Sequence, residues 1–254
     1  MTDPADAVLA SLRCDAEALP QLHVTIAADG SHAVGEVSGH ELWSIRVPRQ
    51  RWLEVLTGQI VATVTMLLRR LVFVHAGSVA IHDGALLLVG DSGAGKTSTV
   101  SALLTCGAAY LSDEVALLDP EAGTVLAFHL PMAVKPWTAR AAGPLPPGRQ
   151  VATQGAVRFH LPIRLARAAP LRTVVFLERG DPPRLRELSR AAAMLRLAQQ
   201  ASSFRYGVRV DDAFRAWARA VRTARCVQLQ ATRPAALAAA LSHMGADDRD
   251  AESR

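Results

Sequence analysis

Lysine is nearly absent from this sequence. Of the 28 residues that are lysine or arginine, only Lys96 and Lys135 are lysines. Together with the many alanines, this points to a compositional bias of the source. Because arginine is the default cation here, each lysine is expected at a position that needs a compact ammonium group.

Cysteine is also scarce, and long apolar runs are missing. The three cysteines, Cys14, Cys106 and Cys226, are scattered along the chain. Their odd number and spacing argue against a disulfide framework or a zinc site and indicate a reducing compartment. No apolar run reaches the roughly 18–20 residues of a membrane span, and the start lacks the pattern of a secretory signal. The sequence therefore predicts a cytoplasmic protein with no membrane partner.

The formal net charge of +5 raises the question of nucleic-acid binding. The arginines are dispersed, and they form neither a basic tail nor a patch interleaved with aromatic residues. We therefore predict solvated or ligand-facing arginines and no nucleic-acid partner.

The chain of 254 residues, half of them hydrophobic, is long enough for one large domain with a substantial core. Short alternating runs predict a small β-rich N-terminal portion over 1–50, and 51–254 is predicted to form the main domain. The stretch Trp137–Gln154 is rich in proline, glycine and arginine. It predicts a long loop over about 137–156, either a substrate-engaging lid or a passive insertion.

Apolar periodicity predicts an α/β protein. Helices are expected near the start, over 1–20, and then over 52–71, 97–104, 185–203, 213–224 and 234–244. Strands are expected over 72–81, 85–89, 108–111, 115–118, 124–128, 171–177 and 226–230. The turn residues at 82–84 predict that the first two of these strands form an antiparallel hairpin. The expected fold class is thus α/β with a mixed sheet that contains antiparallel hairpins.

One glycine-rich stretch organises the chain. An apolar run, Ala85–Val89, precedes a segment that matches the phosphate-binding pattern G-x-x-x-x-G-K-[ST] in strand–loop–helix context. In such a P-loop, backbone N–H groups cradle a polyphosphate, Lys96 reaches the outer phosphates and Thr97 offers its hydroxyl to Mg²⁺. The predicted nucleotide-binding residues are Gly90, Asp91, Ser92, Gly93, Ala94, Gly95, Lys96, Thr97 and Ser98. The alternative is a glycine-rich turn that binds nothing.

Phosphoryl transfer also needs a carboxylate near the metal ion and the acceptor. Asp113 and Glu114 follow the strand that comes after the loop helix, which predicts both carboxylates beside Thr97. His75 is expected at the same end of the sheet, and Lys135 is a candidate for neutralising phosphate charge. The alternatives are a turn pair for the two acids, a core histidine and a surface lysine.

The combination of His75, the Gly90–Thr97 loop and the Asp113-Glu114 pair resembles the catalytic core of HPr kinase/phosphorylase and related serine kinases. The resemblance covers about Val72–Leu118 and implies a P-loop kinase fold akin also to phosphoenolpyruvate carboxykinase. It implies that Asp113 is the general base on a serine hydroxyl and that Glu114 replaces a second, metal-binding aspartate. It also implies that Lys96 and Thr97 occupy the phosphate and Mg²⁺ positions.

The closer likeness is to compact kinases of this group that phosphorylate a serine on a lasso-peptide precursor. The sequence thus predicts an ATP- and Mg²⁺-dependent kinase that transfers the γ-phosphoryl group to a serine hydroxyl of a peptide or small protein. A homo-oligomer is a possible assembly. The alternatives are an ATP-binding regulatory or scaffold protein without transfer activity, HPr kinase/phosphorylase proper, and a small-molecule enzyme of the carboxykinase type.

Overall fold

The computed structural model describes residues 22–27, 32–37, 39–46, 51–68, 71–200 and 210–230, together with residues 238 and 241. The helix predicted over 1–20 lies outside the described residues, as does most of the one predicted over 234–244. Within the described ranges, no helix has the length and apolar character needed to cross a membrane.

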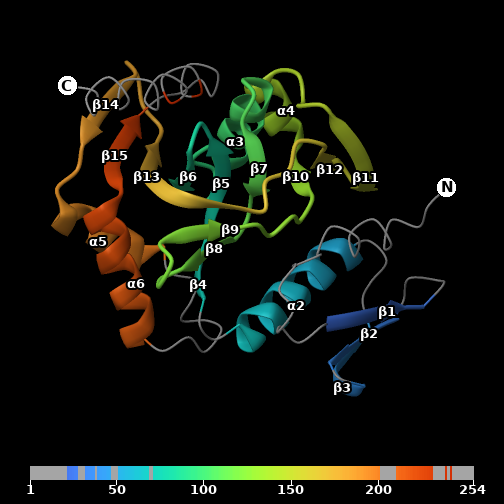
Figure 1. Cartoon of the computed structure of the whole chain (residues 1–254). Helices are drawn as coiled ribbons and strands as arrows, with labels where there is room; N and C mark the ends of the chain where they lie inside the picture. The colour runs from blue at the N-terminus through green and yellow to red at the C-terminus, as the bar shows by residue number, and fades with distance from the viewer. Residues whose placement is uncertain are drawn as a thin grey trace.

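A mixed sheet of nine strands forms the centre of the molecule (Figure 1). Its path runs β4-β8-β9-β13-β6-β5-β7, with β15 beside β13 and β14 beside β15. The strands are β4 (Val72–Val74), β5 (Ala76–Ile81), β6 (Gly84–Val89), β7 (Ala109–Ser112), β8 (Ala116–Asp119), β9 (Thr124–Leu126), β13 (Ala168–Glu178), β14 (Arg184–Glu187) and β15 (Arg225–Gln230). β13 runs parallel to β6 and β15, whereas the β5–β6 and β8–β9 pairs are antiparallel hairpins. The predicted α/β class with a mixed sheet and antiparallel hairpins is confirmed.

Helices cover both faces of this sheet. They are α3 (Lys96–Thr105), α4 (Pro136–Ala142), α5 (Arg190–Gln199) and α6 (Val210–Thr223). Leu87 of β6 belongs to the core cluster that includes residues of α5 and α6, while Leu86 and Leu88 belong to the cluster that includes residues of α3. Because both of its faces are covered, β6 is buried along its whole length, as the unbroken apolar run predicts.

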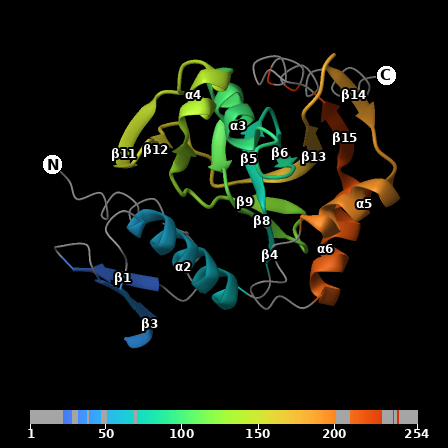
Figure 2. The same cartoon turned by 180° about the vertical axis from the view of Figure 1, so that it is seen from behind.

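The N-terminal portion is a separate antiparallel sheet of three strands, in the order β1-β2-β3. Its strands, β1 (Leu22–Ile26), β2 (His32–Val37) and β3 (His40–Arg46), are followed by α2 (Trp52–Leu67). Val24 and Ala33 share a core cluster with α2, and the Trp43 Nε1–H donates to Thr63 Oγ1 at 2.8 Å. Figures 1 and 2 show α2 and this sheet on one side of the molecule and α5 and α6 on the opposite side. A domain boundary at residue 50 stays a prediction.

The segment predicted to be a long loop over 137–156 has regular structure instead. It holds α4 and strand β11 (Gly148–Gln154), which pairs with β12 (Val157–Pro162) and, through β12, with β10 (Met132–Val134). Proline and glycine mark the ends of these elements and do not prevent them. Pro136 takes the first position of α4, where a missing N–H costs little, and Gly155 has a φ of 58° in the turn between β11 and β12.

Three other predicted elements have different bounds. The strand predicted over 72–81 is broken at His75 into β4 and β5. The helix predicted over 185–203 begins only at Arg190, because residues 184–187 pair with β15 as strand β14. The helix predicted over 52–71 ends at Leu67.

Gly90 is the loop position where packing against the neighbouring strand requires glycine. A Cβ atom there would lie 2.9 Å from the Leu177 carbonyl oxygen and 3.0 Å from the Ala94 Cβ. We predict that Gly90→Ala lowers the free energy of unfolding by about 1–3 kcal/mol, because a backbone atom of β13 must move. Gly58 in α2 has nothing within 4 Å of its Cβ position. Gly58→Ala should therefore raise the free energy of unfolding by about 0.5–1 kcal/mol. Urea titrations of the two variants measure both effects. Equal effects of the two changes would contradict the packing described here.

Candidate functional site

The sheet topology brings four chain segments to one edge. β6 ends at Val89, which is the partner of Phe176 in β13, so the residues after Glu178 lie beside the start of the glycine-rich loop. Ala76 of the antiparallel strand β5 is also a partner of Val89, which puts His75 at this edge. Ser112, the last residue of β7, pairs with Ser78, so Asp113 and Glu114 follow at the same edge.

The glycine-rich loop, Gly90–Gly95, has the backbone conformation that its sequence requires. Gly93 and Gly95 have φ values of 83° and 104°, in the left-handed region that favours glycine. α3 begins directly after the loop at Lys96. Backbone N–H groups at such a helix start are suited to bind an anion. The strand–loop–helix context that the motif predicted is therefore present.

The Lys96 ammonium group folds back onto its own loop. Its Nζ donates hydrogen bonds to the carbonyl oxygens of Gly90 at 2.6 Å and Asp91 at 3.2 Å. Burial lowers the pKa of Lys96, while the nearby Glu114, Asp113 and Asp91 carboxylates oppose that shift. A second contact fixes the loop, because Gln200 Nε2 at the end of α5 donates to Asp91 Oδ1 at 2.5 Å.

Asp113 follows the last residue of β7 and is only 4% exposed. Its Oδ1 atom has no hydrogen-bond partner among the described residues. Burial, followed by the charge of Glu114, raises the pKa of Asp113 to about 7, although Thr97 and the two lysines act in the opposite direction. A carboxyl group with such a pKa is able to exchange a proton near neutral pH.

His75 and Glu114 form a pair at the same edge. His75 Nδ1 lies 3.0 Å from the Glu114 carbonyl oxygen and 3.5 Å from its Oε1 atom. Burial, with a smaller contribution from the charge of Lys96, lowers the pKa of His75. Because a carbonyl oxygen can only accept, Nδ1 carries the hydrogen, and Nε2 of the neutral ring keeps its lone pair.

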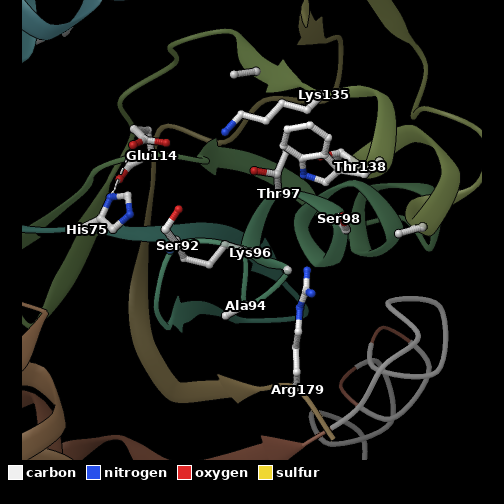
Figure 3. Close-up of a pocket in the computed structure, with 15 residues that line it drawn as sticks. His75, Ser92, Ala94, Lys96, Thr97, Ser98, Glu114, Lys135, Thr138 and Arg179 are labelled. Atoms are coloured by element: carbon white, nitrogen blue, oxygen red, sulfur yellow. Dashed lines mark hydrogen bonds and ion pairs between the residues drawn. The ribbon is translucent and has the colours of Figure 1, made fainter.

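These groups surround a cavity of about 370 Å³ (Figure 3). Of the residues predicted from sequence, the cavity is lined by His75, Ser92, Gly93, Ala94, Gly95, Lys96, Thr97, Ser98, Glu114 and Lys135. Lys135 is exposed, and its Nζ also lies 5.5 Å from the centroid of the Trp137 ring. Asp113 is not a lining residue, although its neighbour Glu114 is one.

The cavity also has walls that sequence reasoning missed. Trp137, Thr138 and Ala141 of α4 line it, as do Ala133 and Arg179. Figure 3 shows the Arg179 side chain extending toward the loop, and its Nη2 atom lies 3.9 Å from the position of a Cβ on Gly93. A signal for Arg179 existed in the sequence, because it follows the strongest predicted strand, and ligands of α/β sheets bind at the carboxyl ends of the strands.

The donor atoms at this edge fit a hard divalent cation. The Thr97 hydroxyl, the Asp113 carboxylate and the exposed Glu114 carboxylate supply oxygen atoms, which Mg²⁺ prefers. In the part of the chain that the structure describes, no cluster of three or more His, Cys, Asp or Glu side chains could hold a metal ion. Mg²⁺ would therefore need phosphate oxygens as well, which is its usual arrangement with nucleotides.

Comparison with known proteins leaves the function open. No family model matches the chain, and no curated protein matches it. Among solved structures, the Hpr(Ser) kinase/phosphatase from Coxiella burnetii is similar over 72% of this chain and 99% of that chain, with 13% sequence identity and a TM-score of 0.38. A likeness this weak carries no functional argument, so the function has to be argued from the site.

The burial of Asp113 makes a prediction about stability. Its carboxyl pKa is higher in the folded protein, at about 7, than its ordinary value of 3.8. The contribution of the neutral Asp113 carboxyl to stability is therefore fully present below pH 3.8. This contribution is lost as the pH rises through about 7, where the buried group must ionise. We predict that Asp113→Asn, measured without metal or nucleotide, raises the free energy of unfolding by roughly 2–4 kcal/mol at pH 8 and by much less at pH 4.

The matched control is Asp83→Asn, in the exposed turn between β5 and β6. Urea titrations at several pH values should show no pH-dependent gain for this variant. A gain for Asp113→Asn that stays constant from pH 4 to pH 8 would contradict the raised pKa.

Proposed function

We propose that the protein is an ATP- and Mg²⁺-dependent kinase that phosphorylates a serine hydroxyl of a peptide or small protein. One observation carries this proposal. The glycine-rich loop, a buried carboxyl with a pKa near 7 and a neutral imidazole meet at one edge of the sheet, where the loop and the imidazole line the same cavity.

Nucleotide binding follows from the loop. Its backbone N–H groups and the start of α3 favour phosphate, and Lys96 supplies a positive charge within the same cavity. In the structure the Lys96 ammonium contacts two loop carbonyl oxygens. On nucleotide binding it exchanges these contacts for the outer phosphates. Bound Mg²⁺ would be held by Thr97 together with Asp113 or Glu114 and would neutralise phosphate charge.

The transfer step is an in-line displacement. The serine oxygen forms a bond to the γ-phosphorus, the bond from the γ-phosphorus to the bridging oxygen breaks, and ADP leaves. Asp113 accepts the hydroxyl proton, which its pKa of about 7 permits near neutral pH. Lys96 and Lys135 oppose the negative charge on the moving phosphoryl group, so positioning and electrostatics supply most of the rate enhancement.

His75 has a defined part in this proposal. Its Nδ1–H is held by the Glu114 carbonyl oxygen, so the ring is oriented with its Nε2 lone pair available as an acceptor. An acceptor at this position orients the hydroxyl or the water beside the transferring group. The neutral ring adds no further positive charge to the two lysines.

The main alternative is a nucleotide-binding protein without transfer activity. The burial of Asp113 favours it, because an acceptor hydroxyl reaches a carboxyl that is 4% exposed only if the surrounding groups move. Among kinase acceptors, the serine of a lasso-peptide precursor is the more specific version of the proposal and rests on the sequence resemblance alone.

Transfer is tested with labelled ATP and serine-containing peptides, each paired with its serine-to-alanine version. We predict label on the serine peptides only. Asp113→Asn should reduce transfer by about 10²-fold or more while changing ATP affinity by less than about threefold.

Glu114→Gln is the variant with which Asp113→Asn is compared, because it removes the charge next to Asp113 and keeps the shape of the side chain. If Asp113→Asn transfers label at the normal rate, Asp113 is not the base. If the wild-type protein binds ATP but labels no acceptor, the binding-only alternative is correct.

A further inference from the structure

The cavity has two chemically different ends. At one end lie His75 and Glu114, as Figure 3 shows. The Lys135 ammonium lies farther along the cavity, 5.5 Å from the centroid of the Trp137 ring. The end with His75 and Glu114 is the place for the γ-phosphoryl group.

The other end follows from the direction of the loop. In a phosphate-binding loop the lysine reaches the β- and γ-phosphates, and the backbone at the loop and helix start holds the α- and β-phosphates. Ser98, the residue after Thr97, lines the cavity although it is only 6% exposed. A nucleotide with its γ-phosphate at the acidic end therefore has its nucleoside near the first turn of α3.

Helix α4 forms the wall at this second end. α3 and α4 pack against each other, and three residues of α4 line the cavity. Trp137 and Ala141 are four positions apart and so share one face of the helix. Thr138 lies between them and is buried, at 4% exposure. The wall is thus largely apolar, and Glu114 is the sole carboxylate among the described lining residues, at the opposite end.

The Trp137 side chain is the notable group in this wall. It is 60% exposed although it is a large aromatic residue. The Lys135 ammonium lies 5.5 Å from the ring centroid, which is within the range of a cation–π contact. An exposed indole in the wall of a cavity that the glycine-rich loop also lines offers a flat surface that matches a nucleobase.

We infer that Trp137 is the stacking platform for the nucleobase of the bound nucleotide. This inference rests on the proposed nucleotide-binding function and assigns the nucleoside subsite. Stacking on an aromatic side chain uses the face of the base, so it strengthens binding of the nucleotide without adding a contact to its phosphates.

Calorimetric titration of the full chain with ADP and, separately, with inorganic tripolyphosphate tests this subsite in the presence of Mg²⁺. We expect Trp137→Ala to weaken ADP binding about 5- to 100-fold and to change tripolyphosphate binding by less than about twofold. Trp137→Phe, which keeps an aromatic face, should restore most of the ADP affinity. The control is Phe214→Ala on α6, an aromatic residue that is 52% exposed and is not part of the cavity wall. It should leave both affinities unchanged.

Two results for Trp137→Ala would overturn the inference and leave the proposed function intact. The first is an unchanged ADP affinity; a raised KM for the peptide would then assign the indole to the acceptor. The second is an equal loss of ADP and tripolyphosphate affinity, which would show that the change acts on the phosphate cradle. If the wild-type chain binds neither ligand, the proposed function itself fails.

Discussion

Two opposite charges buried beside one loop are the constraint on which this site depends. Asp113 and Lys96 are both buried, and nearby charges of opposite sign partly offset the cost of removing each from water. The offset is incomplete, because burial still raises the pKa of Asp113 and lowers that of Lys96. Such pairs of opposed shifts are common where a protein exchanges protons or binds charged ligands. The sheet order creates this arrangement, since β5, β6 and β7 all begin or end at the same edge.

The internal contacts of the loop bear on the proposed nucleotide binding. Loop carbonyl oxygens hold the Lys96 ammonium. A bound phosphate would compete with these oxygens for Lys96, so binding would replace internal contacts and create few new unpaired groups. Segments that are distant in the sequence support the loop by direct contact. Gln200 at the end of α5 donates a hydrogen bond to Asp91, and β13 packs against Gly90.

Sequence patterns predicted the parts of the structure that are set locally. The glycine-rich loop, the β5–β6 hairpin and the buried β13 follow from turn residues and apolar runs, and they are present. Strand β14 was missed because its four residues are all exposed and form a strand only by pairing with β15. Helix α4 was missed because proline and glycine at its ends resemble a loop composition. Trp137 was missed as a cavity residue because only the tertiary packing of α4 brings it to the cavity, whereas Arg179 could have been found from its position after a predicted strand.

The most direct measurement is a crystal structure of the protein with Mg²⁺ and a non-hydrolysable ATP analogue. The account predicts a triphosphate in the glycine-rich loop, with Lys96 Nζ moved from the Gly90 and Asp91 carbonyl oxygens to the β- and γ-phosphates. It also predicts an oxygen of Asp113 facing the metal or the space beside the γ-phosphate. An analogue bound elsewhere, with Lys96 still on its loop carbonyls and Asp113 still enclosed, would contradict the proposal that this cavity transfers phosphate.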